Sequence, residues 1–254
     1  MIKKWKLTIP TLSGNTPRRA YVYVPNEAKR HPERRYPVLY MFDGHNVFYD
    51  SDATYGKSWG MKAYMDRTRT PVIIAAVECN HGANGERLSE YSPYSFYAPG
   101  FGDIVGRADE TMDWMINTFK PMIDEMFPTI PDRECTWIGG SSMGGLISLY
   151  AVLNYNEVFS RAACLSPSLW FGKEHLNPFI KSAKVAPDTV IYMDYGSGEM
   201  KNHRGMRAQY KRVCGLLMDK RIHLTSRIVP NGTHCEASWE SQIPFFMNTL
   251  IYEF

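Results

Sequence analysis

The sequence predicts an α/β fold, in which a central, mostly parallel and twisted sheet is flanked by helices. Short apolar runs of strand length alternate with longer stretches at helical spacing, which is typical of βα units. The composition, 44% hydrophobic and 22% charged, is close to the average for soluble globular domains. Because 254 residues show no composition break and no internal repeat, we expect a single domain over residues 1–254.

The expected strands are identified by their apolar side chains. Residues 5–9 and 19–24 alternate apolar and polar with period two, which favours an antiparallel pair at the start of the chain. The next three runs, over residues 36–42, 72–77 and 135–138, are of the continuous type found in strands that are buried on both faces. Further strand-length runs follow over residues 162–165, 189–193 and 224–229.

Between these runs the spacing predicts helices over residues 107–127, 143–154, 203–220 and 236–252. In the first helix, methionine, isoleucine and phenylalanine recur on one side, which indicates a stripe facing the core. Residues 79–102 have no clear period and are crowded with Gly, Asn, Ser, Pro and Tyr. We expect them to form a long surface loop, and such loops often carry function.

Charge and cysteine usage exclude several classes of protein. The 29 Lys and Arg and 26 Asp and Glu are mixed along the chain and leave a net charge of +3, so no nucleic-acid partner is expected. No run approaches the roughly 20 apolar residues that cross a bilayer, and no apolar signal segment follows the basic start. The five cysteines lack the spacing of a disulfide framework. A cytoplasmic protein without a membrane partner is expected.

Metal and cofactor motifs are not recognised in the sequence. There is no His-Glu-x-x-His and no paired Cys-x-x-Cys. The pairs Cys79 with His81 and His234 with Cys235 are too sparse to build a closed metal site. We therefore expect no metal and no cofactor.

The segment that points to chemistry is Gly140-x-Ser142-x-Gly144, the pattern of a nucleophile elbow. An apolar strand runs into it and an apolar helix leaves it, as this strained turn requires. A flexible Gly/Ser linker or a phosphate loop is the alternative, but no lysine follows the glycines as in a P-loop. The motif predicts an α/β-hydrolase fold with Ser142 as nucleophile.

A serine hydroxyl is a poor nucleophile until a base takes its proton. His234 follows the final strand and precedes the last helix, where the chain order Ser–acid–His places the base, and His203 and His223 are its rivals. The orienting acid should follow the strand at 189–193. We favour Glu199, beyond a Gly-Ser-Gly turn, over Asp194, which is still attached to the strand end.

The oxyanion of an acyl-transfer intermediate needs two backbone N–H donors. The residue after the nucleophile, Met143, is expected to supply one, and His45, in the loop after the strand at 36–42, the other. An ordinary turn at residues 43–44 is the alternative. Aromatic residues, among them Tyr91 and Trp170, are expected at the mouth of the pocket, where they could stack on a substrate ring or simply pack irregular loops.

Residues 36–48, 138–145 and 232–234 resemble the putative esterase family of α/β-hydrolases. That family includes esterase D, enterochelin esterases, feruloyl and acetyl-xylan esterases and mycolyltransferases. The resemblance runs from about residue 8 to the C-terminus. It implies that the residue after the Asp-Gly turn, His45, supplies an oxyanion amide, and that Glu can serve as the acid. Residues 87–93 also look family-like and imply a structural ion pair beside the site.

The expected function is therefore a serine carboxylic-ester hydrolase that acts on a small-molecule ester, with phenolic, acetyl or carbohydrate-linked esters as the leading substrates. The chain lacks the His-Gly loop of esterase D, which makes formyl-glutathione hydrolysis a weaker candidate. An acyltransferase on the same scaffold remains an alternative, because it would use the same residues. A catalytically silent carbohydrate-binding or interaction protein is the other.

Overall fold

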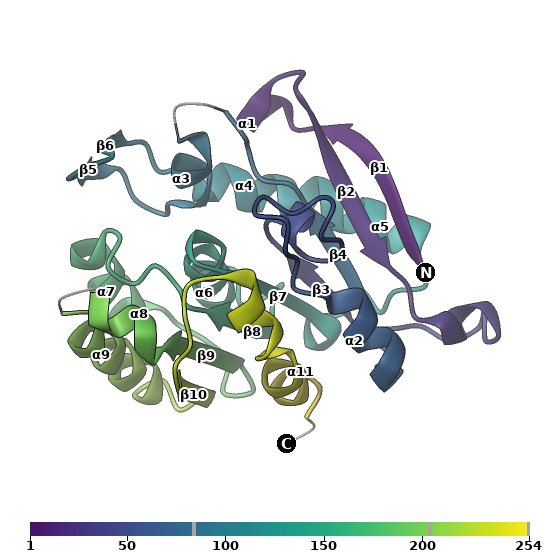
Figure 1. Ribbon diagram of the computed structural model, residues 1–254. Coiled ribbons are helices and arrows are strands. Elements are labelled where there is room, and N and C mark those ends of the chain that lie inside the picture. The colour runs from purple at the N-terminus through teal and green to yellow at the C-terminus, as the bar shows by residue number, and fades with distance from the viewer. Residues whose placement is uncertain (83–84, 203–204, 253–254) are drawn as a thin grey trace.

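Eight strands form one sheet in the order β1-β2-β4-β3-β7-β8-β9-β10 in the computed structural model, which describes residues 1–82, 85–202 and 205–252 (Figure 1). β2 pairs antiparallel with β1 and β4, and the strands from β4 to β10 pair parallel. The strands are β1 Ile2–Thr8, β2 Pro17–Tyr23, β3 Val38–Met41, β4 Ile73–Val77, β7 Thr136–Ser141, β8 Arg161–Leu165, β9 Val190–Gly196 and β10 His223–Val229. Each overlaps a predicted run, so the predicted strands are confirmed.

Helices cover both faces of the sheet because successive strand side chains point to opposite sides. On one face, Val38 and Tyr40 of β3 belong to a core shared with five helices of seven or more residues and with two shorter ones, and on the other Leu39 and Met41 pack in a core with three. The first group is α4 Ala108–Trp114, α5 Lys120–Met126, α6 Met143–Asn154, α7 Lys173–Ser182 and α9 Met206–Met218. The second is α2 Met61–Thr68, α10 Glu236–Glu240 and α11 Ile243–Ile251. The predicted α/β architecture is confirmed.

Two of the predicted helices are interrupted. The helix predicted over 107–127 contains a π-helical turn, Met115–Phe119, between α4 and α5, and its apolar stripe is largely buried. The helix predicted over 236–252 breaks between α10 and α11, where Pro244 stands in the first turn of α11. Within the described residues, no helix is long and apolar enough to span a membrane.

The expectation of a long irregular loop over residues 79–102 was wrong. This segment contains the helix α3 Glu86–Tyr91 and the strand β5 Phe96–Ala98, which pairs with β6 Gly102–Ile104. Elements this short bury too few side chains to show a sequence period. The remaining short elements are α1 Pro10–Ser13, α8 Ser197–Asn202 and the 3₁₀ turns η1 Asn26–Lys29, η2 Gly44–Asn46 and η4 Arg133–Cys135.

Candidate active site

The strand-to-helix turn at Ser142 has the backbone of a nucleophile elbow. Ser142 has φ 58° and ψ −122°, a conformation that costs energy for any residue with a Cβ, and α6 begins at the next residue. A Cβ on Gly140 would lie 2.8 Å from the backbone carbon of Gly144, so the strand and the helix can approach this closely only with glycine. The turn presents the serine side chain at the carboxyl end of β7.

Ser142 begins a continuous chain of hydrogen bonds. Its Oγ lies 2.9 Å from Nε2 of His234, which stands in the loop between β10 and α10. On the other side of the imidazole, Nδ1 lies 2.6 Å from Oε2 of Glu199. The Glu199 side chain is 3% exposed and that of His234 45%, so the carboxylate is buried while the imidazole meets the cavity.

The rival histidines differ in their positions. His223 begins β10 and pairs with Val190 at the start of β9, at the end of the sheet opposite to Ser142. His203 lies outside the described residues. Of the two rivals, His223 is therefore too far along the strand to reach the Ser142 hydroxyl.

A close contact between two turns brings Glu199 to His234. β9 extends to Gly196 and α8 starts directly after it, so the expected Gly-Ser-Gly loop is instead a strand end and the first turn of a helix. The N–H of Gly198 donates to the carbonyl of Gly232 at 3.0 Å, and a Cβ on Gly196 would overlap that same oxygen. Glycine on both sides therefore lets the Glu199 segment pack against the turn that precedes His234.

The second oxygen of Glu199 is fully engaged. Oε1 accepts hydrogen bonds from the Gly196 N–H at 3.0 Å and from the Ser166 hydroxyl at 2.7 Å. The indole N–H of Trp239 donates to the Ser166 oxygen at 3.1 Å, and the Trp239 ring also meets the edge of His234. These donors fix the carboxylate in one orientation, with Oε2 free to face the imidazole.

Asp194, the alternative acid, serves other partners. It lies within β9, 1% exposed, and accepts hydrogen bonds from the Ser166 N–H at 3.1 Å and from the Tyr192 hydroxyl at 2.9 Å. Burial raises the pKa of Asp194 to about 7. Its carboxyl group thus joins the ends of β8 and β9, and none of its hydrogen bonds reaches His234.

The turn after β3 is held by an ion pair. Asp43 has φ 55° and accepts two hydrogen bonds from the Arg87 guanidinium, at 2.8 and 2.6 Å. Burial alone would raise the pKa of Asp43, but the charge and the hydrogen bonds of Arg87, together with smaller contributions from His45 and Cys79, hold that pKa below its ordinary value. With the buried Arg18–Glu90 pair, this confirms the ion pairing expected of the 87–93 stretch.

Tyr91 contacts this turn from the hydrophobic core. Its side chain is 1% exposed, its ring packs on Phe42 at 5.0 Å, and its hydroxyl oxygen accepts the Asp43 N–H at 3.3 Å. The expectation that Tyr91 lines the substrate pocket was therefore wrong. The ring is buried in the core, where its hydroxyl is hydrogen-bonded to the backbone of Asp43.

The two amides expected at an oxyanion hole lie at the ends of neighbouring strands. Met143 is the first residue of α6, where a backbone N–H has no acceptor within its own helix. His45 lies in η2, directly after β3, and β3 pairs parallel with β7. Both residues are thus placed at the carboxyl edge of the sheet together with Ser142.

A cavity of about 410 Å³ opens above this edge. Polar side chains from several segments dominate its lining, which is Asp43, His45, Asn46, Thr54, Tyr55, Cys79, Asn80, His81, Arg87, Ser141, Ser142, His234, Glu236 and Trp239. Trp170 instead lines a separate cavity of about 480 Å³ with Lys173, Gln209 and Arg212. It is 38% exposed and lies beside Phe101, so its expected place in the Ser142 pocket was wrong.

Several residues of the site were missed by sequence reasoning. Ser166 and Trp239 hold Glu199 from two other segments, and Thr54 and His81 reach the cavity from loops. The only signal for Ser166 was its position directly after a predicted strand. Thr54 and Trp239 lie in stretches without any motif, and His81 stands out only in its sparse pair with Cys79, so their roles depend on which segments meet in the fold.

Replacing Arg87 with Met is expected to lower the free energy of unfolding by about 3 kcal/mol, because the Asp43 side chain, 8% exposed, would stay buried without its partner. The pKa of Asp43 is depressed in the folded protein, so this stabilisation is present above about pH 4 and is lost as the pH falls through the folded value. Urea unfolding of both proteins between pH 7 and pH 3 measures the difference.

The matched control for this change is Arg34→Met, which removes an exposed pair with Glu27 and is expected to cost less than about 1 kcal/mol. Equal losses from the two replacements would contradict the assignment of Asp43 as a buried, paired carboxylate. So would a loss at Arg87 that does not shrink at acid pH.

The chain is similar to known proteins over most of its length. A family model described as "Putative esterase" matches residues 12–247. The uncharacterized protein YbbA of Bacillus subtilis (strain 168) is 25% identical over 193 residues, which cover 73% of this chain and 72% of YbbA. A siderophore triacetylfusarinine C esterase of Aspergillus fumigatus is 26% identical over 174 residues, 64% of this chain but only 56% of that esterase.

Among solved structures, an IroE-like serine hydrolase from Shewanella oneidensis superposes with a TM-score of 0.74 at 18% identity, covering 98% of this chain and 79% of the other. At this identity the likeness shows the fold alone. The α/β-hydrolase fold that the elbow motif predicts is confirmed.

Proposed function

The chain belongs to the putative esterase family and is a serine esterase, a carboxylic-ester hydrolase, and we propose that Ser142, His234 and Glu199 are its catalytic triad. The observation that carries this proposal is the unbroken chain of hydrogen bonds from the Ser142 hydroxyl through both imidazole nitrogens to Glu199. Nucleophile, base and orienting acid in contact are the recognised arrangement for acyl transfer through a serine.

In the proposed reaction, His234 takes the proton of Ser142 as the hydroxyl oxygen attacks the ester carbonyl. Glu199 accepts the Nδ1–H hydrogen bond, which keeps Nε2 as the proton acceptor and stabilises the imidazolium that forms. His234 then protonates the departing alcohol, and the acyl group remains on Ser142. A water molecule activated by the same imidazole releases the acid and restores the hydroxyl.

The tetrahedral intermediate carries a negative oxygen, which we assign to the backbone N–H groups of Met143 and His45. The positions of the two residues at the ends of the paired strands β7 and β3 support this role. The Asp43–Arg87 ion pair would then act by holding the His45 turn in its conformation. Loss of one such donor typically costs about 10²–10³-fold in turnover.

For the substrate, we propose a small ester of a polar compound, with phenolic, acetyl and carbohydrate-linked esters as the class to examine. Histidine, asparagine, threonine and arginine side chains make up half of the residues that line the cavity beside Ser142, which suits a substrate with several hydrogen-bonding groups. The half-exposed rings of Phe101 and Trp170 lie outside this cavity. They could contact only a substrate that extends beyond it.

Two measurements test the proposed function. Wild-type protein is expected to hydrolyse p-nitrophenyl acetate and to prefer it over the octanoate, and a fluorophosphonate is expected to add one covalent adduct at Ser142, found by peptide mass spectrometry. Labelling that stops hydrolysis in proportion to the adduct supports the triad. An adduct at another serine, or hydrolysis that survives complete labelling, would overturn it.

A further inference from the structure

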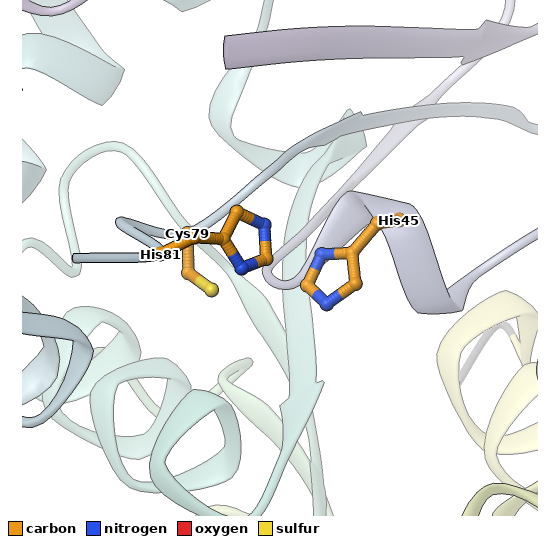
Figure 2. Close-up of side chains that lie close together, drawn as sticks. All are labelled: His45, Cys79 and His81. Carbon is orange, nitrogen blue, oxygen red and sulfur yellow. The ribbon is translucent and has the colours of Figure 1, made fainter. Parts of the chain in front are cut away.

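A second group of chemically reactive side chains lies in the Ser142 cavity. His45, Cys79 and His81 each offer a ligand atom, and these atoms all lie within 4.8 Å of one another. In Figure 2 the two imidazoles and the thiol gather in one place, His45 from η2 and the other two from the segment that follows β4. The adjacent parallel strands β3 and β4 end at the same edge of the sheet, which brings the two segments together.

The His45 ring is prepared to accept a ligand. The residue is 4% exposed, and its Nε2 lies 3.0 Å from the Thr54 hydroxyl. Its Nδ1 is buried and has no hydrogen-bond partner among the described residues. If Nε2–H donates to Thr54, Nδ1 carries a lone pair, and such a second hydrogen bond is what commonly sets the tautomer of a metal-binding histidine. A buried polar atom without a partner destabilises the fold, so a ligand at Nδ1 would relieve that cost.

We propose that His45 Nδ1, Cys79 Sγ and a ring nitrogen of His81 bind a thiophilic divalent cation such as Zn²⁺, with a fourth position open to the cavity. Two imidazoles and a thiolate are ligands that Zn²⁺ accepts, at about 2.0–2.1 Å for nitrogen and 2.3 Å for sulfur. Around a tetrahedral ion such atoms lie about 3.5 Å apart. The three side chains therefore need to converge by about 1 Å, and the exposed His81 has room to move.

Binding must remove one proton. Burial, with the negative charge of Asp43, raises the pKa of the Cys79 thiol, so the free protein carries this proton. A bound cation deprotonates a coordinating thiol, and the proton leaves to solvent. Asp43 keeps its two bonds from Arg87. One divalent ion and one thiolate leave a net charge of +1 at the site.

An ion at this site would inhibit the esterase, an inference that rests on the proposed function. His45, Cys79 and His81 line the same cavity as Ser142 and His234. The ion and the water on its open position would occupy space that the ester needs. They would also tie the His45 side chain to Cys79, next to the amide that we assign to the oxyanion.

Cobalt tests the site without any activity measurement. Metal-free wild-type protein titrated with Co²⁺ is expected to bind one ion per chain, with thiolate-to-cobalt charge-transfer and tetrahedral ligand-field absorption that Zn²⁺ abolishes. Cys79→Ser should lose the charge-transfer band, and His81→Gln should bind at least about tenfold more weakly. The matched controls Cys135→Ser and His31→Gln, which lie outside the cluster, should behave as wild type.

The inhibition is measured for each protein against its own metal-free rate. Zn²⁺ should inhibit wild type and both controls and lose most of its effect on His81→Gln. The proposal is overturned if wild type shows no charge-transfer band, or if the band survives in both Cys79→Ser and His81→Gln with folding verified by circular dichroism. Absence of any esterase activity would count against the proposed function, and the cobalt spectra would still test the site.

Discussion

Ser142→Ala is expected to lower kcat for p-nitrophenyl acetate by about 10⁶-fold. The hydroxyl that His234 contacts at 2.9 Å is the nucleophile that attacks the ester in the proposed mechanism, and alanine leaves the imidazole and the two amides in place without that oxygen. Initial rates at saturating substrate measure the change. Because Ser142 has a positive φ that alanine tolerates no better, we expect little change in stability.

The matched control is Ser148→Ala. Ser148 is a buried serine of α6, the helix that begins directly after Ser142, and its hydroxyl donates to the carbonyl of Gly144. This replacement removes one hydrogen bond, which is worth about 1 kcal/mol of stability, and no group of the proposed mechanism. We therefore expect kcat to change by less than about tenfold. If Ser142→Ala keeps more than a hundredth of the wild-type rate, the assignment of the nucleophile is wrong.

Glu199→Gln is expected to lower kcat by about 10⁴-fold. Glutamine has nearly the shape of glutamate, but its amide can present N–H groups to His234 Nδ1, which favours the tautomer in which Nε2 carries the proton. The imidazole could then no longer take the Ser142 proton, and the imidazolium would lose its counter-charge. The same assay measures the loss, with folding checked by urea unfolding.

Asp194→Asn serves as the comparison, and its effect on kcat is expected to be far smaller than that of Glu199→Gln. Its signature should appear in stability instead. Burial raises the pKa of Asp194 to about 7, above the ordinary value of 3.8, so the folded protein holds this proton more tightly than the unfolded chain. The wild-type stability from this group is therefore lost as pH rises from about 4 to 7, and the Asn variant should lack that slope. If Asp194→Asn lowers turnover more than Glu199→Gln, Asp194 is the acid.

The strands were predictable because each leaves a local pattern of apolar residues. All eight strands of the sheet overlap a run visible in the sequence: central strands such as β3 and β4 are buried and continuously apolar, and the partly exposed edge strands β1 and β10 mix apolar and polar residues. The α3 helix and the β5–β6 hairpin were not, because three to six residues show no period. Tyr91 and Trp170 were misplaced for a related reason. The presence of aromatic residues in a segment does not say whether a ring lines the substrate cavity, packs in the core or lies in another cavity.

The proposed metal-binding cluster of His45, Cys79 and His81 also could not be predicted from the sequence. Cys79 and His81 are two residues apart and form an insufficient motif by themselves. The third side chain, His45, comes from a segment more than thirty residues earlier, and only the pairing of β3 with β4 places it beside them. Ligand sets assembled from neighbouring strand ends leave no fixed spacing in the chain.

What the sequence determined by itself is the elbow at Ser142, because a strand, two glycines and a helix specify that backbone within a few residues. The order of serine, acid and histidine along the chain likewise singles out His234. The tertiary structure decided which carboxylate faces that histidine. Asp194 and Glu199 are five residues apart and chemically alike, but their hydrogen bonds differ. The contact of Gly198 with Gly232 and the hydroxyl of Ser166 orient the Glu199 carboxylate toward the imidazole. The Asp194 carboxylate is instead hydrogen-bonded to the Tyr192 hydroxyl and the Ser166 N–H. Hydrogen bonds between distant segments exist only once the sheet has formed, so no local pattern could supply that distinction.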